Sequence, residues 1–199
     1  MHFDFTFVFT GIIISRGTVR RRQTLRENAA VALAIPRAHL RRGDSVAVNG
    51  VCLTVTSTAR GLYNVVIMPE TLRRTTLRRI QKGDKVNVEL PLRYGEPYGG
   101  HFVLGHIDTV GKVNDVKRGK GGIVARISFP ARFRHLVVAK GSIAIDGVSL
   151  TIVGVHHNWV TVALIPHTLQ RTTLGALSKG SQVNIEFDIF ARYVHATSR

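Results

Sequence analysis

Apolar and polar residues alternate with a period of two along several short segments of the chain. From 45 to 55, every second residue is apolar on each side of Asn49-Gly50, and the segment 142–152 repeats this pattern around Asp146-Gly147. Both dipeptides tolerate positive φ, so the pattern predicts two hairpins with tight turns. Other β-rich or alternating runs lie at 63–68, 85–90, 159–165 and 182–187. This periodicity indicates an all-β protein.

The same segments form an internal repeat. Three pairs of motifs share an offset of 97 residues: SVAVNGVCLTV (45–55) with SIAIDGVSLTI (142–152), PETLRRTTL (69–77) with PHTLQRTTL (166–174), and KGDKVNVEL (82–90) with KGSQVNIEF (179–187). By direct count, 19 of the 46 positions from 45 to 90 are identical to their partners. Chance does not produce three motifs in one register, so the chain contains two copies of one domain.

A fainter match extends the repeat upstream. FTGIII at 9–14 is set over LGHIDT at 104–109, which aligns His106 with Gly11, and the offset there is two or three residues shorter. The repeat predicts one domain at 1–97, a second at 98–189 and a tail at 190–199.

Each copy has one short helical signal, beginning at Pro69 or Pro166, because proline is favoured at the first helical position. Otherwise the copies consist of short strands and glycine-containing turns. No alternation of strands with helices supports a parallel sheet. We therefore expect a small antiparallel barrel or sandwich in each copy.

Composition excludes several classes of protein. An apolar fraction of 44% is too high for a disordered chain, and the single cysteine excludes an internal disulfide framework or a cysteine-rich metal site. The apolar start MHFDFTFVFTGIII contains Asp4 and lacks a basic leading region, so it predicts a strand and not a signal sequence. No run reaches the roughly 18 apolar residues of a membrane span, and we expect a cytoplasmic protein.

Charge is the unusual quantity. The 28 Lys and Arg residues exceed the 12 Asp and Glu residues by 16, which suggests nucleic acid or another anionic partner. The excess is divided between the copies, with +9 in the first 98 residues and +7 in the rest. Aromatic residues are only 7%, and the arginine pairs are assigned to turns and the short helix. These features favour a solvated basic surface over nucleic-acid binding.

The motifs FTGII, SVAVNGVCLTV, MPETLRRTTL, GGHFVLGHID, SIAIDGVSLTI, IPHTLQRTTL and VNIEFDIFARYV together resemble those of the alpha-chain riboflavin synthases, from Phe9 to about Val194. The resemblance implies two Greek-key six-stranded barrels, a short C-terminal helix and a homotrimer. It implies dismutation of two 6,7-dimethyl-8-ribityllumazine molecules to riboflavin and 5-amino-6-ribitylamino-pyrimidinedione, without a metal or other cofactor. Association with lumazine synthase is a further expectation.

Matched residues in the two copies suggest two similar pockets. Thr54 and Thr151 correspond, whereas Cys52 and Ser149 differ at a place where a proton donor could act. From the residues alone, a small buried side chain in a strand is the favoured interpretation of Cys52, and only the resemblance reverses this preference. The resemblance implies that the activity-relevant residues are Cys52, His106, Ser149, Asp188, Phe9 and Lys140.

Substrate contacts follow from the same resemblance. In the first copy these contacts are Gly11, Ile12, Ile13, Ser45, Cys52, Leu53, Thr54, Val66, Ile67, Met68, Pro69, Glu70 and Thr71. In the second they are Gly105, His106, Ile107, Lys140, Ser149, Leu150, Thr151, Ala163, Leu164, Ile165, Pro166, His167 and Thr168.

Several of these residues have a plainer interpretation. His106, as a histidine of near-neutral pKa, can exchange protons with the substrate, but a histidine in a glycine-rich strand is often structural. His101 is expected to be a structural or supporting residue. Lys140 is equally a solvated turn lysine, and Asp146 is a turn former.

Two departures from the family bear on the expected assembly. The segment MHFDFTF precedes Val8-Phe9, so either the barrel tolerates this extension or the edge of the pocket is changed. Only HATSR follows ARYV, whereas the family's C-terminal helix runs further, so a weakened or altered trimer is expected. The alternative function is a non-catalytic lumazine- or flavin-binding protein of the same fold, which would bind the ligand without turnover.

Overall fold

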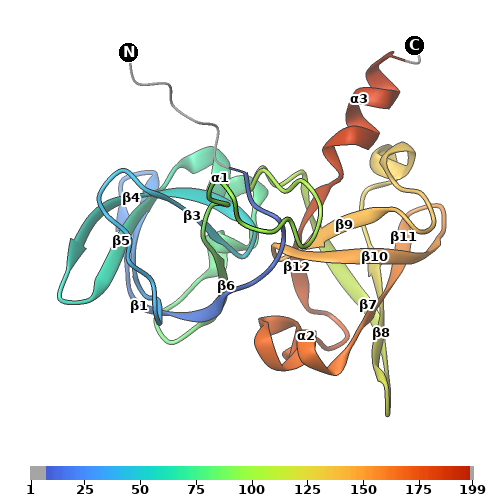
Figure 1. Ribbon diagram of the computed structural model, residues 1–199, viewed down its shortest axis with the longest axis horizontal. Coiled ribbons are helices and arrows are strands. Elements are labelled where there is room, and N and C mark those ends of the chain that lie inside the picture. The colour runs from blue at the N-terminus through green and yellow to red at the C-terminus, as the bar shows by residue number, and fades with distance from the viewer. Residues whose placement is uncertain (1–7, 198–199) are drawn as a thin grey trace.

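Two closed antiparallel barrels lie side by side in the computed structural model, which describes residues 8–197 (Figure 1). The strands of the first barrel are β1 (Ser15–Leu25), β2 (Asn28–Ala34), β3 (Ser45–Val48), β4 (Val51–Ala59), β5 (Leu62–Ile67) and β6 (Lys85–Glu89). Around the barrel their order is β1-β2-β5-β4-β3-β6, and every neighbouring pair is antiparallel.

The second barrel repeats this topology strand for strand. It contains β7 (Thr109–Gly119), β8 (Gly122–Ser128), β9 (Ser142–Ile145), β10 (Val148–Val155), β11 (Trp159–Leu164) and β12 (Gln182–Phe187). Their order, β7-β8-β11-β10-β9-β12, is that of the first barrel with each number raised by six. The prediction of two six-stranded Greek-key barrels is confirmed.

The helices are short and lie outside the barrels. The α-helices are α1 (Pro69–Arg74), α2 (Pro166–Arg171) and α3 (Ile189–Thr197), and the 3₁₀ helices are η1 (Thr76–Arg79), η2 (Ala131–Leu136) and η3 (Thr173–Ala176). The two proline-initiated helices and the C-terminal helix are as predicted. Between residues 8 and 197, no helix is long and apolar enough to cross a membrane.

Alternation along the strands separates the barrel core from the outer face. On β4, Val51, Leu53 and Val55 are buried in the first core, whereas Cys52 and Thr54 point to the other side of the strand. The two cores are distinct clusters, and a third, smaller cluster lies between the barrels. This division determines which strand residues are available to a ligand.

The segments that precede the barrels cross to the opposite barrel. We call residues 8–14 leader 1 and residues 101–108 leader 2. They pair with each other through backbone hydrogen bonds from Phe9 N to Val103 O at 2.8 Å, from Val103 N to Phe9 O at 3.1 Å and from His101 N to Thr10 O at 3.1 Å. Beyond this pairing, Ile13 packs against the core of the second barrel and Ile107 against the core of the first.

The tight turns of the two repeats meet at the centre of the molecule. Gly50 and Gly147 have φ of +75° and +77°, and a Cβ on either would lie 2.6 or 2.7 Å from the backbone nitrogen of the other. Asn87 and Asn184 are fully buried beside them, and each donates its amide to the backbone oxygen of the opposite turn. The repeated Asn/Asp-Gly motif therefore serves both the hairpins and the contact between the barrels.

Three predictions in this region are wrong in detail. The glycine that matches Gly11 is Gly105, since both have a φ near +78° and both face the corresponding residue of the other barrel, so His106 corresponds to Ile12. The start of the chain was predicted to be a strand; residues 1–7 lie outside the described part, and Phe9 forms only an isolated bridge. Arg20–Arg22 lie within β1 and not in a turn.

Candidate active site

The first candidate pocket lies on the outer face of the first barrel. Strand pairing places Ser45 opposite Thr54 and Ala47 opposite Cys52, so these four side chains share one face of the β3–β4 hairpin. Val66 on β5 also points outward, next to Thr54 by the register of β4 and β5. Ser45 and Ala47 are buried, so the groups that a ligand on this face would meet are Thr54, Val66 and the half-buried Cys52.

The second barrel repeats this arrangement with different chemistry. Ser142 lies opposite Thr151, and Ala144 lies opposite Ser149, on the outer face of β9 and β10. Ala163 extends the surface on β11. Ser149 therefore occupies in the second barrel the place of Cys52 in the first, as the repeat predicted.

Each pocket receives a leader from the other repeat. The backbone amide of Cys52 donates to Gly105 O, and that of Ser149 donates to Gly11 O, both at 2.9 Å. A Cβ on either glycine would lie 2.6 Å from the Cβ of the facing Ser149 or Cys52, and both glycines have positive φ. Only glycine allows this approach, which brings Gly11–Ile13 to the second pocket and Gly105–Ile107 to the first.

Two buried glutamates hold the leaders in place. Glu186 accepts backbone N–H groups from Leu104, Gly105 and His106 at 2.6 to 3.2 Å. Glu89 does the same for Thr10 and Gly11 in leader 1. Burial raises the pKa of Glu186 to about 7 and also raises that of Glu89, although the donated hydrogen bonds oppose the shift.

Cys52 is half-buried on β4 and is the chain's single thiol. Burial raises its pKa, a hydrogen bond with Ser45 acts against this rise, and the nearby charge of Glu186 adds to it. The thiol is therefore protonated at neutral pH, as a weak hydrogen-bond donor and not as a thiolate nucleophile.

His106 is exposed and lines a cavity of about 420 Å³. Leader 2, the end of β12, the start of α3 and Arg74 of α1 surround this cavity. Its charged groups include Asp108, which forms an ion pair with Arg192, and Glu186. His106 is thus free to meet a ligand at the junction of the two barrels.

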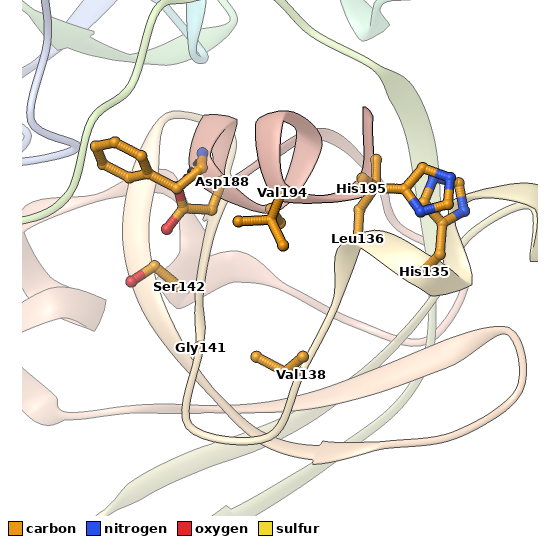
Figure 2. Close-up of a pocket in the computed structure, with 10 residues that line it drawn as sticks. His135, Leu136, Val138, Gly141, Ser142, Asp188, Val194 and His195 are labelled. Atoms are coloured by element: carbon orange, nitrogen blue, oxygen red, sulfur yellow. Dashed lines mark hydrogen bonds between the residues drawn. The ribbon is translucent and has the colours of Figure 1, made fainter. Parts of the chain in front are cut away.

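Asp188 and Ser142 lie at one end of a second cavity, of about 400 Å³, beneath α3 (Figure 2). The overlapping rings of His135 and His195 lie at the other end, with centroids 3.9 Å apart. Asp188 also begins the helix, because its Oδ1 accepts the N–H of Phe190 at 2.9 Å. Asp188 is therefore both a helix cap and part of a cavity wall.

Lys140 adopts a backbone conformation that favours glycine. Its φ is +66°, and its counterpart in the first copy is Gly43, with a φ of +94°. The amides make the same contact, to Ile152 O and Val55 O respectively, each at 2.8 Å. A lysine in this conformation costs about 1 kcal/mol relative to glycine, a cost that Arg26, Arg37 and Arg60 also carry in their turns.

Some predicted contacts face away from the outer surface. Leu53, Ile67, Leu150 and Leu164 are core side chains, so only their backbone groups can reach a ligand. Phe9 is fully buried with Ala47, Val103 and Ala144 between the barrels, with Cys52 packed against it. Phe9 can thus influence the pocket only through this packing.

Other predicted contacts are exposed apolar groups. Ile12, Met68 and Ile165 have 48%, 56% and 60% of their surface exposed, so their side chains are accessible from solvent. The helices that follow Met68 and Ile165 contribute Pro69, Glu70 and Thr71, and Pro166, His167 and Thr168. Glu70 is paired with Arg74 and Arg73, and the hydrogen bonds that they donate, together with their charges, lower its pKa.

Sequence analysis missed Glu89 and Glu186 as parts of the site. Both occupy the same place in the repeated motifs KVNVEL and QVNIEF, where an acid follows buried apolar residues. That repeated buried acid was an available signal. Their partners are backbone groups of distant leaders, which the strand pattern alone does not reveal.

Comparison with known proteins supports this description. The lumazine binding domain family matches twice, at residues 10–91 and 104–188. Two solved structures of LumP are similar, one complexed with 6,7-dimethyl-8-(1'-D-ribityl)lumazine (TM-score 0.81, 25% identity, covering 89% of this chain and 98% of that one) and one complexed with riboflavin (TM-score 0.84, 25% identity, 90% and 98%). The fold and the repeated outer-face pockets thus define a protein with two lumazine-binding domains.

Curated relatives specify the family. The riboflavin synthase of Mycobacterium bovis is 40% identical over 96% of this chain and 98% of the relative, and that of Bacillus subtilis is 38% identical over 94% and 88%. The riboflavin synthase of Brucella abortus is 41% identical over 94% and 96%. The chain belongs to the riboflavin synthase family and is an enzyme of this type.

Proposed function

We propose that the chain catalyses the dismutation of two molecules of 6,7-dimethyl-8-ribityllumazine. A four-carbon unit passes from one molecule to the other and gives riboflavin and 5-amino-6-ribitylamino-pyrimidinedione. The observation that carries this proposal is the duplication of one outer-face pocket on two barrels of the same chain, in a family of riboflavin synthases.

Duplication suits a reaction between two identical molecules. Two like pockets bind two like heterocycles, and holding them face to face removes much of the entropic barrier of a bimolecular reaction. The functional units of the proposal are residues 1–97, 98–189 and 190–199. The leaders join the first two units, because each pocket includes backbone from the other repeat.

The candidate residues have two proposed roles, proton exchange and ligand binding. His106 exchanges protons with the methyl and ring carbons of the substrate, for which an exposed imidazole is suited. Cys52, Ser149, Thr54 and Thr151 provide hydrogen bonds at the barrel faces. Lys140 and Asp188 bind polar groups at the edge of the second pocket, and Phe9 supports Cys52 from behind.

The proposal includes a homotrimer, in which the reacting pair lies between the first barrel of one subunit and the second barrel of the next. Phe190, Tyr193 and Val194 of α3 are large exposed apolar side chains, which supports contact between copies. Association with lumazine synthase and a cytoplasmic location, where a free cysteine stays reduced, complete the proposal. Mass measurement in solution tests the trimer.

Turnover tests the reaction. Purified chain is incubated with 6,7-dimethyl-8-ribityllumazine, and the absorbance and fluorescence of riboflavin are followed. We expect one riboflavin for every two lumazines consumed, and His106→Gln to slow turnover about 100-fold, the usual contribution of a general acid–base group. His157→Leu, an exposed histidine on the β10–β11 loop, is the matched control and should not change the rate. Tight binding without product would instead indicate the non-catalytic binding protein.

A further inference from the structure

His101 is a buried histidine that none of the proposed steps uses. It begins leader 2 and has only 8% of its surface exposed. Its Nδ1 lies 2.7 Å from Oγ of Ser149, which is hydrogen-bond distance. The histidine thus contacts the one side chain that most clearly distinguishes the second pocket from the first.

The chain around His101 holds the ring in this position. The backbone amide of His101 donates to Thr10 O at 3.1 Å, which ties leader 2 to leader 1. A Cβ on Gly100 would overlap that same Thr10 oxygen and lie 3.0 Å from the Cβ of Ser149. The glycine before His101 therefore allows the backbone to approach Ser149 closely enough for the ring to reach its hydroxyl.

Ser149 is the one side-chain hydrogen-bond partner of the imidazole in residues 8–197, since Nε2 is buried without one. Burial lowers the pKa of His101, and the charge of Asp188 only partly opposes this, so the ring is neutral at neutral pH. A neutral imidazole carries one proton, and free histidine prefers it on Nε2. In that tautomer Nδ1 is an acceptor for the Ser149 hydroxyl.

The two repeats differ at both members of this pair. The offset of 94 residues that aligns Gly11 with Gly105 aligns Phe7 with His101 in sequence, and Cys52 corresponds to Ser149. Phenylalanine has no hydrogen-bonding atom, and a thiol is a weak donor. Within the described residues, the hydroxyl of Ser149 thus lies at hydrogen-bond distance from an imidazole, whereas the hydrogen bond of the corresponding thiol is with Ser45.

We propose that His101 is a positioning residue, whose Nδ1 accepts a hydrogen bond from the Ser149 hydroxyl. This hydrogen bond directs the Oγ lone pairs toward the ligand. The second pocket then recognises a hydrogen-bond donor of the bound lumazine, a ring N–H or a ribityl O–H, whereas the first pocket cannot do so with equal strength. This inference rests on the proposed function, and it gives the two pockets different polarity for two identical substrates.

A double-mutant cycle tests whether His101 acts through Ser149. His101→Phe, which installs the first-copy residue at similar volume, should lower kcat/KM about tenfold, the size of one hydrogen bond. In a Ser149→Ala background the same change should have less than a twofold further effect. An undiminished tenfold loss in that background would mean that His101 acts by another route and would overturn the proposal.

Two further variants separate positioning from folding. His101→Asn places an amide oxygen near the position of Nδ1 and should stay within about threefold of wild type. If it falls as far as His101→Phe, the proposal fails. Ser149→Cys leaves His101 intact, so it reports on the pair even if His101→Phe does not fold; wild-type activity in this variant would also contradict the proposal.

Wild type separates this inference from the proposed reaction. If wild type binds riboflavin but makes none from lumazine, the proposed reaction is contradicted. The double-mutant cycle of His101→Phe and Ser149→Ala is then repeated with the Kd of riboflavin, measured by fluorescence quenching, in place of kcat/KM. The same fold-changes are expected there. A wild-type chain that binds neither lumazine nor riboflavin overturns both proposals.

Discussion

The first and second repeats are alike where they meet and different where a ligand would bind. Residues at the junction correspond in pairs: Gly11 with Gly105, Gly50 with Gly147, Asn87 with Asn184 and Glu89 with Glu186. The residues that differ lie around the pockets: Cys52 against Ser149, Gly43 against Lys140 and Pro91 against Asp188.

This contrast separates two demands on one duplicated sequence. At a junction with pseudo-twofold symmetry the two members of a pair make the same contacts, which favours the same residue on both sides; Asn49 and Asp146 are the exception, and both still accept one backbone N–H. Two pockets that hold one molecule as donor and the other as acceptor of a carbon unit require different residues. Differences between the repeats therefore point to what distinguishes the two pockets, whereas Thr54 and Thr151 are common to both.

The largest expected effect breaks the symmetric junction. Gly11→Ala or Gly105→Ala places a Cβ 2.6 Å from the Cβ of Ser149 or Cys52, in a backbone of positive φ. Each variant should lose about 3 kcal/mol or more of unfolding free energy, since both strain and overpacking act. Urea unfolding measures the loss. Gly83→Ala is the control, because its φ is +99° but nothing lies within 4 Å of its Cβ, and it should lose only about 1 kcal/mol.

A smaller effect comes from an unequal pair at the central turns. Asp146 Oδ1 accepts the N–H of Asn184 where Asn49 Oδ1 accepts that of Asn87, and burial raises the pKa of Asp146 to about 7. The folded state thus favours the protonated acid. Stability from this group is complete below pH 3.8, and it declines as the pH rises toward 7.

Asp146→Asn makes the second turn like the first and should remove this decline. Relative to the variant, wild type should lose up to about 1.4 kcal/mol per pH unit between pH 5 and 6.5. Unfolding by urea at several pH values measures the difference, and Asp84→Asn, at an exposed loop, controls for a general change of charge. Parallel stability curves for wild type and Asp146→Asn would contradict the burial argument.

The smallest effect exchanges the residues of one turn. Gly43→Lys should cost about 1 kcal/mol, because the lysine must adopt positive φ without a ligand to bind. Lys140→Gly should change the unfolding free energy by less than about 1 kcal/mol, yet raise the Kd of riboflavin several-fold. Unchanged affinity would make Lys140 a surface residue of the turn.

Sequence predicted the repeated hairpins and the helices because their signals are local. Asn49-Gly50 and Pro69 determine the structure of only a few neighbouring residues, and the repeat at an offset of 97 residues shows each of these signals a second time. β1 was missed as a strand because SRGTVRRRQTL is mostly polar, and only Gly17 and Val19 are buried along it. Its strand conformation comes from pairing with β2 and β6, which is not a local property.

Within the candidate site, the barrel residues were accessible to sequence reasoning and the crossed leaders were not. Cys52 and Ser149 stand at matched positions of an alternating strand, which already predicts one common face. That Gly105 lies against Cys52, and Gly11 against Ser149, depends on a path of backbone between barrels. The same path explains the misalignment of His106, because a loop of different length changes the offset there.

The crossed leaders also set an order for assembly on the ribosome. Synthesis completes β6 of the first barrel at Glu89, but the amide of Cys52 receives its partner only when Gly105 has been made. Leader 1 finds its place against Ser149 only once β10 of the second barrel has been made. Nascent first halves therefore expose an unfinished surface throughout elongation, and within one chain neither pocket is complete until the second barrel has folded.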